Sequence, residues 1–261
     1  DLIGTRRNHP DRPILKITRN IYVCDGCAII IRYASPRDLR ILESHGFKKI
    51  YLLIDDDIFS LGEHGGLPSD YRERLLGYRD GIFRRLLDLV THVVAPSERI
   101  LAAYRRKRAL QLDPAQTHKT GALVHHNRTR HFDVVFAATR SHLQDLDHMA
   151  PALVEFLKAR PDARLTTFLN GHAPRILKNL PNAIHLPMME WGRYRRYVAE
   201  NRFHAAIAPA LDTDFNRARS ISRLYDHAAY GAAGVYSHQP PFSGIVAHGQ
   251  SGLLLPNNPP E

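Results

Sequence analysis

Apolar and polar residues follow each other along this chain in a pattern that predicts strands and helices in turn. The uniformly apolar runs 27–34 and 48–54 are typical of strands that are covered on both faces, as in a parallel sheet. Between them, residues 36–46 carry apolar side chains at helical spacing and end at Gly46. Further helices are predicted at 71–89 and 97–110, with a strand at 91–97 between them. The first part of the chain is therefore predicted to be an α/β domain.

A second alternating series begins after residues 111–121, a stretch that is poor in apolar side chains. Strands are predicted at 133–138, 163–171, 182–187, 203–211, 233–237 and 251–256, and helices at 145–161, 191–202 and 219–231. Strands and helices that alternate with short links imply a doubly wound parallel sheet. We therefore predict an α/β protein of two domains, 1–130 and 131–261, with a linker near 127–131.

The composition is that of a globular protein that does not cross a membrane. Of the 261 residues, 44% are hydrophobic and 24% charged, and no apolar run approaches the roughly 20 residues of a membrane span. The net charge of +10 is concentrated in residues 1–130, which carry 23 Lys and Arg against 15 Asp and Glu. This bias favours an anionic partner, namely nucleic acid, acidic lipid or a phosphorylated substrate, and a solvated basic surface explains it equally well. Because the chain begins at Asp1 and ends on NNPPE, we expect it to be part of a longer protein.

The only two cysteines, Cys24 and Cys27, are separated by two residues in the run CDGC. This spacing occurs in redox-active and zinc-binding pairs, but zinc needs about four ligands and there is no second cysteine pair. We therefore expect reduced thiols at the start of a buried strand, because the apolar run AIII follows directly. Reduced thiols favour a cytoplasmic protein.

Ligands of open α/β sheets bind beyond the carboxyl ends of the strands, so the loops at those ends are the first candidates for a site. The loop after 133–138 contains Thr139 and Ser141 and leads into a helix, whose first backbone amides are able to hold a phosphate. The loop after 163–168 contains Gly171, which permits the close approach of a ligand to the backbone.

The third such loop, after 203–211, leads into a predicted helix on which Arg219, Arg223 and Asp226 share one face. A guanidinium near the start of a helix favours a diphosphate, and a carboxylate further along accepts hydrogen bonds from ribose hydroxyls. From the spacing alone, an exposed Arg–Asp surface pair is the simpler explanation.

The first domain carries a run of aspartates, Asp55, Asp56 and Asp57, at the end of a predicted strand. Two aspartates one residue apart bind the metal of a nucleotide diphosphate in GT-A glycosyltransferases, and a structural role in capping the next loop is an alternative. His64 follows in the run LGEHGG and is a candidate base or ligand, although a lone loop histidine is usually just exposed.

The stretch FNRARSISRLYDHAAYGAAGVYSHQPPFSGIVAHGQSGLLLPN resembles the signature of retaining GT-B glycosyltransferases, which have a helix with carboxylates, a small-residue turn and a glycine-rich end. It is most similar to bacterial enzymes with a donor-binding domain of the glycogen-synthase or group 1 type. DVVFAATRSHLQDL resembles the first strand and loop of that domain, and YLLIDDDIF resembles an acidic strand end of the amino-terminal domain. The resemblance covers residues 25–261 and implies two Rossmann-like domains.

Carried over to this sequence, the resemblance implies a nucleotide-sugar site in the second domain. Asp226 is the expected ribose ligand, Arg219 and Ser220 are expected to bind the diphosphate, and Asn216 is expected to bind the donor sugar or a phosphate. The remaining residues expected to line the cleft are Thr139, Ser141, His142 and Gly171. The family has two glutamates separated by seven residues, and here these positions hold Ala218 and Asp226.

The resemblance therefore predicts an enzyme that moves a sugar from a nucleoside diphosphate sugar to a hydroxyl acceptor, with retention and without a metal or other cofactor. The acceptor, a free, lipid-linked or protein-linked glycan, would meet the first domain, where His64, Asp55 and Asp57 are candidates. One alternative is a degenerate module that binds without turnover, because Ala218 replaces a carboxylate. Another is a nucleic-acid-binding protein, suggested by the basic run 105–108, but no interleaved aromatics or known motif support it. The basic first half also suggests association with the inner face of an anionic membrane.

Overall fold

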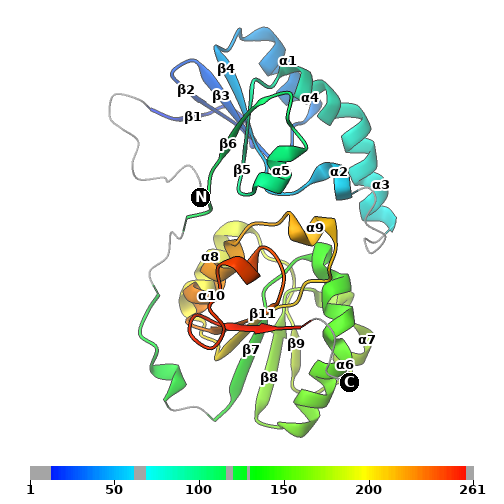
Figure 1. The fold of residues 1–261 in the computed structure, drawn as a ribbon, viewed down its shortest axis with the longest axis vertical. Coiled ribbons are helices and arrows are strands. Elements are labelled where there is room, and N and C mark those ends of the chain that lie inside the picture. The colour runs from blue at the N-terminus through cyan, green and yellow to red at the C-terminus, as the bar shows by residue number, and fades with distance from the viewer. Residues whose placement is uncertain (1–12, 62–68, 116–119, 128–129, 257–261) are drawn as a thin grey trace. The chain divides into compact units, whose positions relative to one another are not determined.

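A computed structural model describes residues 13–61, 69–115, 120–127 and 130–256, and these form two α/β units (Figure 1). Unit 1 comprises residues 1–115 together with Arg217–Ser220, and unit 2 comprises residues 116–216 and 221–261. The segment 116–130, which the sequence pattern assigns to the first domain, thus groups with unit 2. Within the described residues, no helix has both the length and the apolar character that a membrane crossing requires.

Unit 1 is built on a six-stranded sheet whose strands follow each other in chain order, β1 to β6. The first two strands, β1 (Leu15–Lys16) and β2 (Ile21–Cys24), are antiparallel additions to β3. The strands β3 (Cys27–Ile31), β4 (Lys49–Leu53), β5 (His92–Ala95) and β6 (Arg108–Gln111) are parallel. The predicted strands 27–34, 48–54 and 91–97 correspond to β3, β4 and β5. The hairpin strands β1 and β2 were not predicted.

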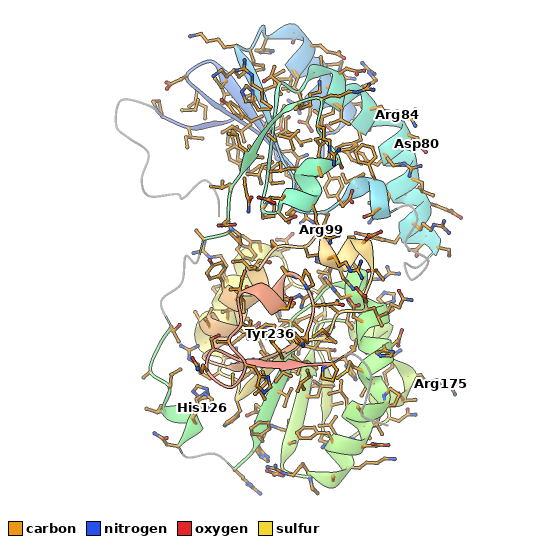
Figure 2. The ribbon with its side chains drawn as sticks, viewed as in Figure 1. Asp80, Arg84, Arg99, His126, Arg175 and Tyr236 are labelled. Carbon is orange, nitrogen blue, oxygen red and sulfur yellow. The ribbon has the colours of Figure 1, made fainter. Side chains whose placement is uncertain are left out.

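The helices of unit 1 are α1 (Pro36–Ser44), α2 (Ile58–Leu61), α3 (Ser69–Tyr78), η1 (Arg79–Phe83), α4 (Arg84–Leu89) and α5 (Glu98–Ala102). Helix α1 begins where the sequence predicts it, because Ser35 and Asp38 form a reciprocal capping box and Pro36 occupies the first turn. The predicted helix 71–89 is the continuous stretch from α3 through η1 to α4, where Asp80 and Arg84 form an exposed ion pair at 3.5 Å (Figure 2).

The helix predicted at 97–110 is wrong in its second half. Helix α5 ends at Ala102, and residues 108–111 form the edge strand β6, which pairs in parallel with β5. Ser97 caps the helix as expected, with its Oγ accepting from Ile100 N at 3.3 Å. The basic run 105–108 is therefore a turn that leads into a strand, where tertiary pairing with β5 overrides the local helix propensity.

Unit 2 contains six parallel strands in the order β12-β11-β10-β7-β8-β9. The strands are β7 (Phe132–Phe136), β8 (Ala163–Thr167), β9 (Ala183–His185), β10 (Ala205–Ala208), β11 (Ala233–Ser237) and β12 (Leu253–Leu255). The longer connecting helices are α6 (Leu143–Ala159), α8 (Trp191–Glu200) and α10 (Ser222–Tyr230). The short helical segments are η2 (Val124–His126), η3 (Arg140–His142), η4 (Asn170–His172), α7 (Arg175–Lys178), α9 (Asp214–Arg217) and η5 (Phe242–Gly244).

The uniformly apolar strands are explained by a hydrophobic core on each face of this sheet. Helices α6 and α7 lie on one face, and α8 and α10 lie on the other (Figure 1). Along β7, Val134 and Phe136 belong to the core beneath α6, whereas Val135 belongs to the core beneath α8 and α10. Successive side chains of a strand point to opposite faces, so a strand covered on both sides has apolar residues at consecutive positions. The predicted doubly wound parallel sheet is confirmed in unit 2.

The segment that follows residue 119 is bound to unit 2 by side-chain contacts with its backbone. Thr120 Oγ1 donates to Ala228 O at 2.9 Å. The imidazole of His125 contacts Phe203 O at 3.0 Å, and that of His126, labelled in Figure 2, contacts Gly231 O at 2.8 Å. These contacts explain why residues 120–127 belong to unit 2 although their composition resembles that of a linker.

Candidate functional site

The strand order of unit 2 determines where a ligand would bind. Counted along the chain, the strands lie in the order 3-2-1-4-5-6, and the order reverses between the first strand, β7, and the fourth, β10. In doubly wound sheets, ligands bind outside the carboxyl ends of the strands at this reversal. The relevant loops are 137–142 after β7 and 209–213 after β10. Both are among the loops that the sequence selects as candidates.

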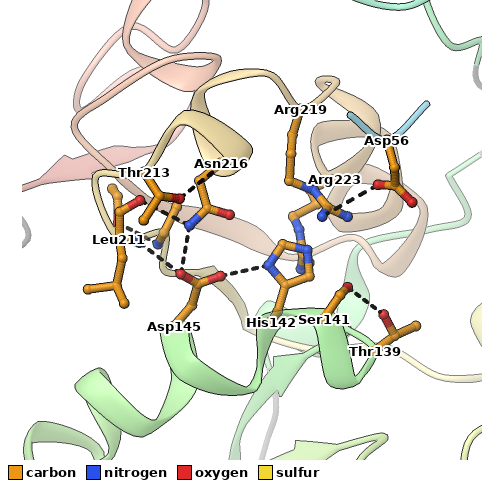
Figure 3. A network of polar contacts seen from close by, with 12 residues as sticks. Asp56, Thr139, Ser141, His142, Asp145, Leu211, Thr213, Asn216, Arg219 and Arg223 are labelled. Atoms are coloured by element: carbon orange, nitrogen blue, oxygen red, sulfur yellow. Dashed lines mark hydrogen bonds and ion pairs between the residues drawn. The ribbon is translucent and has the colours of Figure 1, made fainter. Parts of the chain in front are cut away.

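A buried carboxylate, Asp145, joins these two loops (Figure 3). Its Oδ2 accepts from His142 Nδ1 at 2.7 Å, and its Oδ1 accepts from the backbone N of Leu211 and from Asn216 Nδ2, both at 2.8 Å. The exposed fractions of Asp145, His142 and Asn216 are 4%, 3% and 1%. A hydrogen-bonded network at such depth fixes the positions of its members, so the two loops are held together at the switch point.

The amide of Asn216 is oriented by two acceptors. Its Nδ2 donates to Asp145 Oδ1 and to Leu211 O, at 2.8 and 2.9 Å, while its buried Oδ1 has no hydrogen-bond partner among the described residues. Helix α9, which carries Asn216, begins with a local bond from Asn216 N to Thr213 Oγ1 at 3.2 Å. A fixed amide with an unused oxygen is suited to accept a hydrogen bond from a ligand.

The loop after β7 carries polar groups of the kind that contact phosphate. Thr139 Oγ1 and Ser141 Oγ are 3.0 Å apart and precede α6. Arg223, on α10, donates from Nη1 to Ala137 O at 3.2 Å, and its guanidinium lies 5.9 Å from the centre of the Phe136 ring. A cation is thereby held at the carboxyl end of β7, where the switch point lies.

Asp226 lies one turn further along α10 and is half-buried. Burial raises the pKa of this carboxyl to about 6, and the positive charge of Arg223 opposes the shift. Burial and the nearby Asp226 carboxylate both raise the pKa of the Tyr194 hydroxyl on α8, so the two groups are neighbours. A carboxyl with a raised pKa near a cation is a common feature of ligand sites.

The prediction that Arg219, Arg223 and Asp226 share one helical face is wrong for Arg219. Helix α10 begins at Ser222, so Arg219 and Ser220 lie in the bend that precedes it, and both belong to unit 1. There the Arg219 guanidinium pairs with Asp56 at 3.6 Å. The carbonyl of Ala218, a residue of the unit 1 core, accepts from Ser97 Oγ at 2.6 Å. The chain thus has a break between α9 and α10, where Ala218 packs in the unit 1 core, and residues 219–221 of the helix predicted at 219–231 lie in this break.

The aspartates after β4 have separate roles in unit 1. Asp55 and Asp56 both pair with Arg32, at 2.7 Å from Asp55 Oδ1 to Arg32 Nε, and burial and the negative charge of Asp56 raise the pKa of Asp55. Asp57 Oδ1 accepts from Phe59 N and Ser60 N, at 3.0 and 3.3 Å, which caps α2. The capping role that the sequence allows for this run therefore applies to Asp57. His64 lies outside the described residues.

Gly171 lies in η4, in the loop after β8, and is exposed. A Cβ atom at this position would have no heavy atom within 4 Å, and the left-handed residue of the loop is Asn170, with φ 46°. The unit 2 fold therefore does not require a glycine here. The residues that the sequence reasoning missed are Asp145 and the orienting carbonyl of Ala137. The sequence signal for Asp145 was its position three residues after His142. Polar residues at this spacing are common in helices, so the pair did not stand out.

The comparisons with known proteins concern the fold. No protein-family model matches the sequence, and no curated protein matches it closely enough to count as a relative. The pneumococcal O-GlcNAc transferase GtfA, solved with UDP and GlcNAc, has a TM-score of 0.52 at 10% identity, over 94% of this chain and 53% of GtfA. A TarM variant from S. aureus, solved with fondaparinux, α-GlcNAc-glycerol and UDP, has a TM-score of 0.54 at 11% identity, over 88% of this chain and 45% of TarM.

A trehalose-6-phosphate synthase, studied as an enzyme of glycosyl transfer with retention, has a TM-score of 0.51 at 10% identity, over 88% of this chain and 62% of the synthase. The chain thus spans between 45% and 62% of the length of these three proteins. The expected fold of two Rossmann-like α/β domains of the GT-B class is confirmed.

Proposed function

We propose that the chain is a glycosyltransferase that moves a sugar from a nucleoside diphosphate sugar to a hydroxyl acceptor, with unit 2 as its donor-binding domain. The observation that carries the proposal is the buried Asp145 network, which joins the loops after β7 and β10 at the switch point of the sheet. Similar folds bind UDP in GtfA and TarM, which supports a uridine donor.

In this proposal, the polar groups at the carboxyl ends of the strands each bind a different part of the donor. The Arg223 guanidinium, the Thr139 and Ser141 hydroxyls and the backbone amides that begin α6 face the diphosphate, whose charge grows as the glycosidic bond breaks. The Asn216 Oδ1 accepts from a hydroxyl of the donor sugar. Of the other residues that the sequence nominates, His142 and Gly171 are proposed to line the site. The diphosphate contacts expected of Arg219 and Ser220 stay predictions, because both residues belong to unit 1.

Asp226 would accept the ribose hydroxyls, and this role explains its unfavourable environment without a ligand. The burial that raises its pKa to about 6 penalises the charged form, and two ribose hydroxyls would replace the lost hydration. Unit 1 would hold the acceptor, with Asp55 and Asp57 near the ends of its parallel strands. We also propose that the transfer retains the configuration of the sugar, which transfer with retention by the similar synthase supports. The same proposal includes independence of metal ions and a place at the inner face of the membrane.

The first test is binding of UDP to the full chain by calorimetry, for the native protein and for Asp226→Ala. Losing a charged acceptor costs roughly 1.5 to 3 kcal/mol, so UDP affinity should fall by about 10- to 150-fold. Uridine should lose a comparable factor, because the ribose is the group affected. The matched control is Glu155→Ala, an exposed carboxylate on α6, which should leave the affinity unchanged. Unchanged UDP affinity in folded Asp226→Ala would contradict the ribose assignment.

The second test separates an enzyme from a binding module. UDP-glucose and UDP-GlcNAc are incubated with the chain, with and without EDTA, and released UDP is measured. Turnover that survives EDTA supports a metal-independent transferase. UDP binding without release of UDP from either sugar, in the presence of a glycan acceptor panel, would favour the degenerate module that Ala218 suggests.

A further inference from the structure

The two cysteines lie opposite each other across a two-residue turn of unit 1. Cys24 ends β2 and Cys27 begins β3, and the two residues are direct partners in the antiparallel ladder. The loop between them is Asp25–Gly26, with φ values of 51° and 73°. Two successive left-handed residues define a type I′ turn, the two-residue turn whose twist matches that of the flanking strands. Cys24 and Cys27 are therefore the pair that closes this hairpin.

The Cα separation of this pair lies within the range of a disulfide. Partners that flank a two-residue turn form a hydrogen-bonded pair, whose Cα atoms lie about 5.5 Å apart, and their side chains point to the same face. Disulfides join residues whose Cα atoms are about 4.4–6.8 Å apart. Both thiols are free and half-buried, so a small oxidant has access to them. The Cys27 thiol makes a weak contact, 3.9 Å to Asp25 O, which would not oppose a new bond.

The hairpin is held on its other side by the parallel part of the sheet. Cys27 pairs with Lys49 of β4, and Lys48 N donates to Gly26 O at 3.0 Å. The aliphatic stem of Lys48 also packs against the turn, 3.5 Å from the place of a Cβ at Gly26. The turn is therefore anchored in the reduced protein. Closing the bond requires rotation of the cysteine side chains and an approach of their Cβ atoms, from the roughly 4.5–5.5 Å of a cross-strand pair to the roughly 3.5–4.5 Å of a disulfide.

We propose that Cys24 and Cys27 are a site of reversible oxidation, at which a low-molecular-weight disulfide such as oxidised glutathione converts the two thiols to a cross-strand disulfide. One cysteine thiolate attacks the glutathione disulfide and releases one glutathione thiolate, leaving a mixed disulfide. The second cysteine thiolate attacks the protein sulfur of the mixed disulfide and releases the second glutathione. Both cysteine protons pass to the glutathione thiolates, so one oxidised glutathione yields two reduced molecules. A zinc role is not supported, because no group of three or more metal-binding side chains occurs among residues 13–61, 69–115, 120–127 and 130–256.

The experiment is a redox titration of the full chain in glutathione buffers of fixed ratio, quenched with iodoacetamide and read by intact mass. We expect an internal disulfide, with both sulfurs protected and the mass lower by two hydrogen atoms. The folded hairpin holds the two sulfurs close together, so the equilibrium constant should be about tenfold or more larger in the folded protein than in urea-unfolded protein. Cys24→Ser and Cys27→Ser should each stop at the mixed glutathione disulfide. An equilibrium constant that is equal or smaller in the folded protein, or products that are mainly mixed or intermolecular disulfides, would overturn the proposal.

Discussion

The substitution Asp145→Asn tests whether the buried network at the switch point supports unit 2. Asparagine preserves the shape of the side chain, and its oxygen is able to keep the bonds from Leu211 N and Asn216 Nδ2. Its NH₂ group then faces His142 Nδ1, where the native carboxylate accepts at 2.7 Å. His142 must move its proton to Nε2, and the charge-assisted bond is replaced by a neutral one. Loss of a hydrogen bond to a buried charged group costs about 1.5 to 3 kcal/mol, and we expect that reduction in the free energy of unfolding.

Urea denaturation followed by far-UV circular dichroism measures this change, with Asp147→Asn as the matched control. Asp147 lies two residues away on α6 and is exposed, so its substitution should change the free energy of unfolding by less than about 0.5 kcal/mol. Asp145→Ala should cost more than Asp145→Asn, because all three donors then lose their acceptor. If Asp145→Asn and Asp147→Asn have the same stability, the network does not hold the loops and the structural basis of the proposed site is wrong.

Two further predictions concern α10 and its ends. Gly231 has φ 67°, and a Cβ there would lie 2.7 Å from Leu123 Cδ2. Gly231→Ala should therefore lower the free energy of unfolding by about 1 to 3 kcal/mol. The control Gly171→Ala should not lower it, because a Cβ at Gly171 would lie in open space. The pKa of Asp226 is about 6 in the folded protein and lies above its value in the unfolded protein, so folding takes up a proton. The contribution of Asp226 to the free energy of unfolding therefore decreases as pH rises from about 4 through 6. Asp226→Asn, compared with the native protein in urea at several pH values, should therefore become relatively more stable as pH rises. Buried His227, whose pKa is lowered to about 3, has the opposite pH dependence. Because His227 is present in both proteins, its effect cancels when their free energies of unfolding are subtracted. A difference that does not vary with pH would refute the assignment of Asp226 as a buried acid.

The hydrophobic pattern was sufficient to predict the unit 2 sheet because its strands are covered on both faces. The run 134–138, which begins in β7, is apolar at every position, and such runs are distinctive in a sequence. The pattern failed at residues 108–111, which are exposed throughout: Ala109 and Leu110 are too short a run to mark a strand, and β6 is defined by its pairing with β5. It also failed at β1, which is two residues long.

The candidate site was predictable where a loop's position follows from strand order, and not where a contact depends on packing. Thr139 and Ser141 follow β7 and Asn216 lies in α9 after β10, in segments that any doubly wound sheet brings to its carboxyl edge. The role of Asp145 depends on the approach of Leu211 N from the other loop, which no local pattern encodes. The break before α10 depends on burial of Ala218 in the core of unit 1, and helix propensity contains no information about that burial.

The short outer strands of both sheets also have a consequence for self-association. An outer strand presents unpaired backbone groups to which another chain is able to add, and length increases that hazard. The sheet of unit 2 ends in β9 and β12, which are three residues each, and that of unit 1 ends in the two-residue β1. The longest outer strand, β6, has four residues and begins with the exposed cation Arg108. Within the part of the chain that the structure describes, each sheet thus leaves little backbone for intermolecular strand addition, which protects a protein rich in β-forming apolar segments against aggregation at its edges.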